Sequence, residues 1–162
     1  MLRIRAAVAA IIIASATRTA AQVPSLKLTA LDGATKTVTV TELQALPQVE
    51  VADSSAEAGR LVFRGPTVRS VVSLIGAPEG RALRGPSMMI VVVAEASDGY
   101  KVAYALAELD EQFGARTAIV ALTENGKPLA AQFGPLRIAM AGEAHRARWI
   151  RQLTTLRLVR VQ

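Results

Sequence analysis

The sequence predicts an α+β domain with mixed or antiparallel β-sheets and a few short helices. Three observations support this class. Short runs with an apolar residue at every second position predict strands. Asp-Gly and Asn-Gly turn sequences separate several of these runs, and only brief segments show helical spacing. Strands, a helix, and then further strands and hairpins are typical of the α+β class.

The N-terminal residues have the layout of a secretory signal peptide. Arg3 and Arg5 give a basic start, an apolar run covers residues 6–16, and small residues precede Gln22. The apolar run is too short to span a bilayer comfortably, which argues against a retained membrane anchor.

The expected cleavage site sets the boundaries of the mature chain. We expect cleavage after Ala21, with Ala16 as the alternative. Residues 1–21 are then the signal peptide, and residues 22–162 form a single domain that is long enough to bury a core. We therefore expect a periplasmic or secreted protein that is not membrane-embedded after cleavage.

The mature chain carries only a small net charge. The full sequence holds 19 Lys and Arg against 13 Asp and Glu, a net charge of +6. The predicted signal peptide contains three arginines and no acid, so its removal lowers the net charge to +3. Half of the basicity belongs to a targeting signal, and we therefore expect no nucleic-acid partner.

The residue types exclude several kinds of catalytic and metal site. The chain has no cysteine, which excludes disulfides, thiolate metal sites and a cysteine nucleophile. His145 is the only histidine, so one chain cannot form a histidine-rich metal site. The sequence also lacks a glycine-rich phosphate loop, a zinc-protease pattern and a nucleophile elbow.

The first half of the mature chain predicts strands and one short helix. SLKLTA and TKTVTV alternate apolar and polar residues on either side of Asp32-Gly33, which predicts a hairpin. Thr41 followed by Gln44 fits a capping box for a short helix that ends before Pro47. VEVAD and RLVFRG are predicted strands, separated by the polar loop SSAEAG.

A second helix and a long buried strand are predicted next. Thr67 can cap a helix whose apolar residues fall at helical spacing, and Gly76 ends it. SMMIVVVAEA is a continuous apolar run, which predicts a strand covered on both faces. Asp98-Gly99 then predicts a tight hairpin turn into KVAYAL.

The following segments complete the predicted sheets. ALAELDEQFG predicts a short acidic helical turn, and TAIVAL predicts another buried strand. Glu124-Asn125-Gly126 predicts a further turn.

The stretch that begins at Gly134 holds the best candidates for a ligand site. Leu136, Ile138 and Met140 alternate with Arg137, so a strand would bury the first three and turn the arginine to the opposite face. HRARWIR then places guanidinium groups on both sides of Trp149, which suits a flat, polar ligand. Residue types alone favour the plainer interpretation, in which the tryptophan is a core aromatic and the arginines are solvated.

Three segments together resemble a known family. FRGPTVRSVVSLIGAP, SDGYKVAYALAELDEQFG and ENGKPLAAQFGPLRIAMAGEAHRARWIRQLTTLRLV are similar, in order and spacing, to the sulfite-oxidase-type molybdopterin-binding domain in its short stand-alone secreted form. The resemblance covers nearly the whole mature chain. The most informative part is a glycine and proline followed by an arginine in a strand, with a basic residue directly before tryptophan further on.

The resemblance implies roles for two arginines and the tryptophan. In the family's enzymes, the arginine corresponding to Arg137 lies at the cofactor. The basic residue corresponding to Arg148, with the main chain before it, holds the pterin and its phosphate. The same resemblance implies a functional role for Trp149.

The chain departs from the family at the metal. The enzymes of this family bind molybdenum through a cysteine thiolate, and this chain has no cysteine. We therefore expect no protein-ligated metal, and sulfite oxidation by the usual mechanism is not expected. The part of the site that binds the pterin does not require the cysteine, so the resemblance still implies a pterin or molybdopterin-like ligand.

A pterin has a flat ring and a guanidine-like donor edge, and both features need matching protein groups. The ring can stack on an aromatic face, and a carboxylate is the natural acceptor for the donor edge. Asp98 is the first candidate and Glu95 the second, although aspartate is also an ordinary turn residue. The residues expected to bind the ligand are Arg137, Arg148, Trp149, Asp98, Tyr100, Arg64 and His145.

Some of these candidates also have plainer interpretations. His145 can equally be an exposed loop residue, and Phe133 and Tyr104 are expected in the core because their neighbours are apolar.

Three functions remain open at this stage. The first is a periplasmic pterin-binding protein without redox activity, as the resemblance implies, which acts as a signalling partner of the periplasmic domain of a membrane enzyme. The second is a molybdopterin-dependent oxidoreductase or a cofactor-carrying subunit. The third is a ligand-free protein-interaction module on the same fold.

Overall fold

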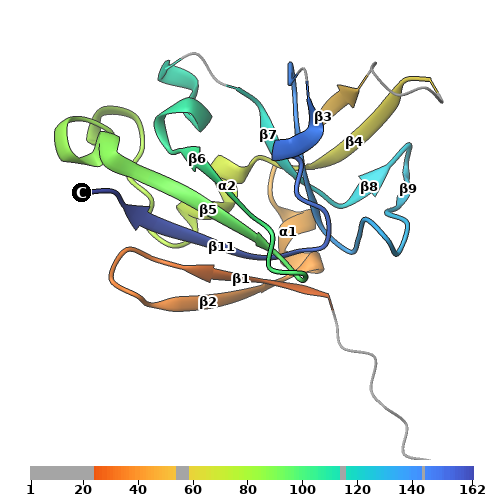
Figure 1. Ribbon diagram of the computed structural model, residues 1–162, viewed down its shortest axis with the longest axis horizontal. Coiled ribbons are helices and arrows are strands. Elements are labelled where there is room, and N and C mark those ends of the chain that lie inside the picture. Colours follow the sequence, from red (N-terminus) through yellow and green to blue (C-terminus); the bar gives the residue numbers. More distant parts are fainter. Residues whose placement is uncertain (1–23, 54–58, 114–115, 144) are drawn as a thin grey trace, which may run out of the picture.

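The computed structural model describes residues 24–53, 59–113, 116–143 and 145–162. The predicted signal peptide and most of the predicted SSAEAG loop lie outside these residues. Within the described ranges, no helix is long and apolar enough to cross a membrane. The predicted α+β class is confirmed, because three β-sheets are accompanied by a few short helices (Figure 1).

The largest sheet has five strands in the order β2-β1-β11-β5-β6. Only β1 and β11 pair in parallel, so the sheet is mixed. The C-terminal strand therefore lies in the middle of the sheet, between the first strand and the β5–β6 hairpin (Figure 1). The strands are β1 (Ser25–Thr29), β2 (Thr35–Thr39), β5 (Ile90–Ala96), β6 (Lys101–Ala105) and β11 (Leu153–Arg160).

Two smaller sheets lie beside this one. A four-stranded sheet has the order β3-β4-β8-β9, and β7 pairs antiparallel with β10 in a two-stranded sheet. An isolated bridge between Thr67 and Ile119 links the end of β4 to β7. The strands are β3 (Gln48–Asp53), β4 (Leu61–Pro66), β7 (Ala118–Ala121), β8 (Thr123–Glu124), β9 (Lys127–Pro128) and β10 (Arg137–Met140).

All helices of the described chain are short. Two are α-helical and five are 3₁₀ turns of three to five residues. The predicted acidic helical turn is confirmed as η3 and η4. The helices are α1 (Val40–Ala45), α2 (Val68–Ser73), η1 (Gly80–Ala82), η2 (Gly85–Met89), η3 (Ala107–Leu109), η4 (Glu111–Phe113) and η5 (Arg146–Arg148).

The first α-helix begins two residues earlier than its sequence pattern predicts. The capping box is formed by Thr39 and Glu42, not by Thr41 and Gln44. The Thr39 hydroxyl accepts from the Glu42 N–H at 3.2 Å, and the Glu42 carboxylate accepts from the Thr39 N–H at 2.7 Å. A carboxylate near the helix N-terminus is also favoured by the helix dipole, which explains why glutamate forms the box.

The second α-helix follows its prediction. Thr67 caps it by accepting from the Ser70 N–H at 3.0 Å. Gly76 follows the helix with a φ of 75°, a conformation that favours glycine. The apolar face of the helix is buried at Val68, Val71 and Val72.

All three predicted turns are confirmed, including Asp32-Gly33 between β1 and β2, but the strand before Asp98-Gly99 is shorter than expected. Gly99 has a φ of 85° in the β5–β6 hairpin, and Asn125 and Gly126 have φ values of 49° and 75° between β8 and β9. The first part of SMMIVVVAEA belongs to η2, where Pro86 occupies the beginning of the turn. β5 then alternates buried and half-buried residues, so it is not fully covered on both faces.

The two smaller sheets approach each other closely at Gly65, where the backbones of β4 and β7 meet. A Cβ atom built at Gly65 would lie 1.9 Å from the carbonyl oxygen of Val120 in β7. The obstacle is main chain, which cannot rotate away as a side chain can. β4 and β7 therefore need glycine at this point.

We expect Gly65→Ala to lower the free energy of unfolding by about 3 kcal/mol or more, because the methyl group must push two strands apart. Urea unfolding of both proteins measures the loss. Gly76→Ala is the control, since its Cβ would meet nothing within 4 Å and only its positive φ is unfavourable, at a cost of about 1 kcal/mol. Equal losses in the two variants would contradict the close-approach argument.

Candidate functional site

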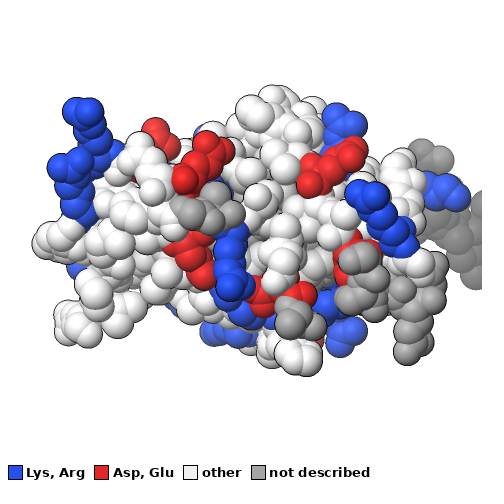
Figure 2. Space-filling model, turned by 90° about the horizontal axis from the view of Figure 1, so that it is seen from above, with Lys and Arg blue, Asp and Glu red and all other residues white. Residues whose placement is uncertain are grey.

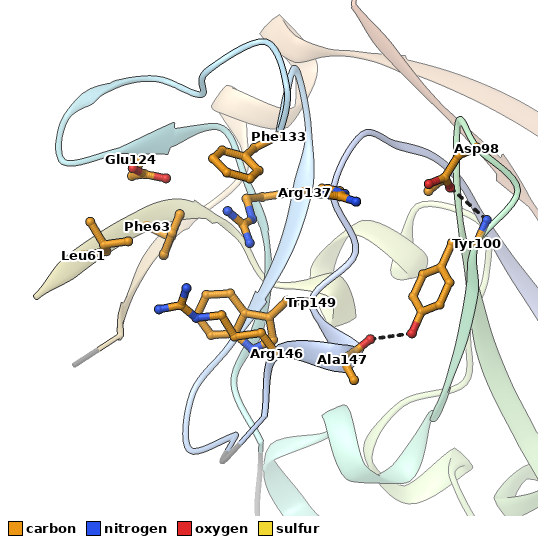
Figure 3. Close-up of a pocket in the computed structure, with 12 residues that line it drawn as sticks. Leu61, Phe63, Asp98, Tyr100, Glu124, Phe133, Arg137, Arg146, Ala147 and Trp149 are labelled. Carbon is orange, nitrogen blue, oxygen red and sulfur yellow. Dashed lines mark hydrogen bonds between the residues drawn. The ribbon is translucent and has the colours of Figure 1, made fainter. Parts of the chain in front are cut away.

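The three sheets meet around a cavity of about 410 Å³. β4 and β8 supply one wall, the β5–β6 turn supplies another, and β10 and η5 supply the remainder (Figure 3). The cavity is lined by Leu61, Phe63, Ala96, Asp98, Tyr100, Glu124, Phe133, Arg137, Arg146, Ala147, Trp149 and Arg151.

Arg137 places a buried cation in this cavity. Its strand, β10, has no exposed residue, so both of its faces are covered and Arg137 is only 8% exposed. The guanidinium carbon lies 4.8 Å from the centre of the Phe63 ring, 5.2 Å from that of Phe133 and 5.5 Å from that of Trp149. Figure 3 shows the guanidinium directed into the space between these rings.

The Arg137 guanidinium has no hydrogen bond or ion pair to the described part of the chain, and its buried Nε–H lacks an acceptor there. Burial lowers its pKa, an effect opposed in part by the negative charge of Glu124. Three cation–π contacts compensate some of the lost hydration, at about 0.5 to 2 kcal/mol each. The guanidinium therefore retains unused donors for a ligand.

Trp149 lines the same cavity and carries a second buried donor. Its ring packs edge-on against Phe63, with centroids 5.5 Å apart and an interplanar angle of 86°. Its Nε1–H is buried and has no acceptor among the described residues. The Arg146 guanidinium lies 5.8 Å above the indole and forms an ion pair with Asp53.

Asp98 and Tyr100 form the wall on the other side of the cavity (Figure 3). The Tyr100 hydroxyl donates to the carbonyl of Ala147 at 2.8 Å, which ties the β5–β6 turn to η5. Asp98 Oδ1 accepts from the Tyr100 N–H at 3.0 Å. A carboxylate has two oxygens and several acceptor directions, so this turn-forming role leaves Asp98 able to accept from a ligand.

Arg148 does not line the cavity, although the resemblance implies a pterin-binding role for it. Its guanidinium donates to Glu108 at 2.6 Å and to Glu143 at 3.4 Å. It also lies 4.9 Å from the centre of the buried Tyr104 ring. Two acids thus neutralise Arg148, and its side chain joins η3, η5 and the loop after β10.

The main chain of Arg148 is held as firmly as its side chain. Its carbonyl accepts a hydrogen bond from the Tyr104 hydroxyl. Burial raises the pKa of Tyr104, which keeps this hydroxyl protonated as a donor. Tyr104 lies in the core, as predicted.

Three weaker candidates also lie outside the cavity lining. Arg64 is exposed and neighbours Phe63 on β4, so it points to the opposite face and borders a different hollow. His145 is exposed at the N-terminal end of η5. Glu95, the second candidate for the ring edge, forms an ion pair with Lys101 at 3.4 Å.

The structure adds eight residues to the four predicted ones that line the cavity, and five of the eight have aromatic or charged side chains. Phe133, expected in the core, is half-buried and lines the cavity because it precedes the turn into β10. Phe63 is the inward neighbour of Arg64 in the quoted FRG segment, and this alternation is the signal that could have identified it. The five are Phe63, Glu124, Phe133, Arg146 and Arg151.

The charges of the cavity lining are mixed. Arg137, Arg146 and Arg151 face Asp98 and Glu124, and Arg146 is already paired with Asp53. Acidic and basic side chains are likewise interspersed on the face shown in Figure 2. Among the described residues, no group of three or more His, Asp or Glu is arranged to hold a metal ion. The arrangement suits a polar organic ligand with both donors and acceptors.

Comparisons with known proteins support a fold relation alone. No family model matches the sequence, and no curated protein matches it. Among solved structures, the chain is similar to the sulfane dehydrogenase SoxCD from Paracoccus pantotrophus, with a TM-score of 0.59 and 14% identity. The match covers 83% of this chain and 38% of the other, so the chain spans well under half of that protein's length.

We expect Arg137→Met to leave the free energy of unfolding unchanged or to raise it. The substitution removes an unpaired buried charge, whose desolvation costs several kcal/mol, and keeps an unbranched side chain against the three aromatic rings. The lowered pKa of Arg137 leads to the same expectation. The folded state disfavours the protonated guanidinium, so this charge lowers the free energy of unfolding at every pH below that pKa.

Urea unfolding at neutral pH measures this effect. Arg137→Ala is the comparison, because it also removes the charge but leaves an unfilled space, so we expect it to be less stable than Arg137→Met by about 1 to 3 kcal/mol. A loss of more than about 1 kcal/mol in Arg137→Met would show that the cation–π contacts outweigh the desolvation cost.

Proposed function

We propose that this protein binds a pterin outside the cytoplasm and has no redox activity of its own. One observation carries the proposal: Arg137 Nε–H and Trp149 Nε1–H are buried without acceptors among the described residues, and both side chains line an aromatic cavity. Leaving buried donors unsatisfied costs about 1 to 3 kcal/mol each. A ligand with acceptor atoms would recover this cost.

A pterin matches the cavity in size and chemistry. A volume of about 410 Å³ is near the lower end of small-molecule sites, which run from about 300 to 1,000 Å³, and suits a fused bicyclic ring with a short substituent. The ring's carbonyl oxygen and ring nitrogens would accept from Arg137 and Trp149. Its amino-pyrimidine edge would donate to Asp98 or Glu124, which lie in other parts of the lining.

The residues fit only the organic half of a molybdenum cofactor. The chain supplies no thiolate, because it has no cysteine. The arginine expected to hold the pterin phosphate, Arg148, is neutralised by Glu108 and Glu143 outside the cavity lining. We therefore favour a pterin without a protein-held metal, bound mainly through Arg137.

The fold relation supports a second candidate, a molybdopterin-dependent oxidoreductase or cofactor-carrying subunit. We infer a sulfite-oxidase-type fold from the sequence resemblance, and the similarity to a chain named as a dehydrogenase is consistent with it. Molybdenum found by elemental analysis, after expression in a host that makes the cofactor, would favour this candidate over the first.

The decisive experiment is titration of the purified protein with pterins. Trp149 is the only tryptophan, so its fluorescence reports directly on the cavity. We expect saturable quenching at low micromolar concentration or better. Arg137→Met should weaken binding about tenfold to a hundredfold, as the loss of a hydrogen bond to a charged group does.

Matched variants separate the cavity from general charge effects. Arg64→Met removes an exposed cation outside the cavity lining and should leave the affinity unchanged. Asp98→Asn should weaken binding if this carboxylate receives the donor edge. Absence of quenching across oxidised and reduced pterins would remove the proposal.

The location of the protein is part of the proposal and has a simple test. Mass spectrometry of the protein recovered from the cell envelope should find an N-terminus at Gln22, as expected from cleavage after Ala21. An uncleaved chain in the cytoplasm would contradict it. A periplasmic pterin-binding protein could in turn act as a signalling partner for the outer domain of a membrane enzyme.

A further inference from the structure

Among the described residues, four of the six exposed large hydrophobic side chains lie in segments that meet at one end of the molecule. Their exposed fractions run from 40% to 48%, and they are Met88, Met89, Phe113 and Val161. They come from η2, η4 and the chain end after β11; η2 and the chain end lie at the left end of Figure 1, and η4 lies above them, nearer the middle. We call this surface, together with Arg81, Arg84 and Arg160, the arginine–methionine tip.

The tip brings together segments that are far apart in the chain, and hydrogen bonds connect them. The Val161 N–H donates to the Met89 carbonyl at 2.8 Å, and Arg160 Nη1 donates to the Pro86 carbonyl at 2.5 Å. A hollow of about 430 Å³ separates η2 from η4, and its lining includes Arg84, Met88 and Phe113. The apolar groups therefore belong to one continuous surface, which is the feature that distinguishes a docking site from scattered exposed residues.

Three exposed arginines dominate the charge of the tip. Arg81, Arg84 and Arg160 are exposed and form no ion pair with any described residue. Glu79 is bonded to Arg69, and Glu111 lines a neighbouring hollow beside α2. At the left end of Figure 2, projecting basic side chains stand beside uncharged surface.

We propose that the arginine–methionine tip docks the protein peripherally on an anionic phospholipid surface. Lipid phosphates accept hydrogen bonds and carry negative charge, which matches a rim of three exposed guanidinium groups. Methionine, phenylalanine and valine can enter the boundary between headgroups and acyl chains, while long arginine side chains keep their charge at the phosphates.

Two other occupants match the tip less well. A second copy of the chain docked through the same surface would place arginines against arginines, because a two-fold interface is self-complementary. A protein partner would need an acidic apolar segment matched to the tip, and nothing in the structure selects one. The tip shares no lining residue with the cavity, so its proposed role is independent of pterin binding.

Vesicle co-sedimentation of the protein purified from the cell envelope tests the proposal. The probes are vesicles of phosphatidylcholine alone and of phosphatidylcholine mixed with phosphatidylglycerol. We expect binding to the mixed vesicles only, and weaker binding as salt rises. The double variant Arg81→Gln/Arg84→Gln should reduce it about tenfold or more, since each arginine near an anionic surface contributes. Met88→Ser/Met89→Ser should also weaken it.

A matched control removes two cations from another part of the surface. Lys27→Gln/Lys36→Gln alters two exposed residues of β1 and β2 and should bind like the wild type. All variants share one N-terminus, so any contribution of the leader cancels.

Three outcomes would overturn the proposal. The first is no binding to phosphatidylglycerol vesicles. The second is an equal loss of binding in the lysine and arginine variants. The third is capture of an acidic protein by the wild type but not by Arg81→Gln/Arg84→Gln, without vesicle binding, which would assign the tip to a protein partner.

Discussion

The architecture around the cavity depends on one unusual constraint, a guanidinium buried among three aromatic rings. Arg137 comes from a strand with no exposed residue, and it can be accommodated only because Phe63, Phe133 and Trp149 reach it from three different segments. Their π faces replace part of its lost hydration but supply no hydrogen-bond acceptor. The fold thus accommodates a polar group in its interior, and the proposed ligand site rests on the missing acceptor for the Arg137 Nε–H among the described residues.

Two arginines of the HRARWIR segment, Arg146 and Arg148, make different contacts. Arg146 lies over the indole and pairs with Asp53, whereas Arg148 joins Glu108 and Glu143. Tyr104 and Tyr100 bond the carbonyls of Arg148 and Ala147. These contacts fix η5, and through it the tryptophan, so most of the basic character of this segment serves to position one aromatic ring.

The sequence predicted local structure well where a short-range rule applied. Asp98-Gly99, Asn125-Gly126, the Thr67 cap and Gly76 all follow from backbone chemistry within a few residues. The first capping box was displaced because Thr39 and Thr41 are both suitable caps, and the true partner is Glu42. The strand before Asp98 was predicted too long because apolar content alone does not separate a strand from the 3₁₀ turn of η2.

The sequence by itself determined the α+β class and the absence of a thiolate metal site, since these depend on residue type and local pattern, and its resemblance to a known family made Arg137, Trp149, Asp98 and Tyr100 candidates. Only the tertiary structure decided which cations are available to a ligand. Arg137 and Arg148 look alike in sequence, yet one lacks a carboxylate partner in the described chain and the other has two. That difference arises from long-range packing, because Glu108 lies 40 residues from Arg148 in the chain.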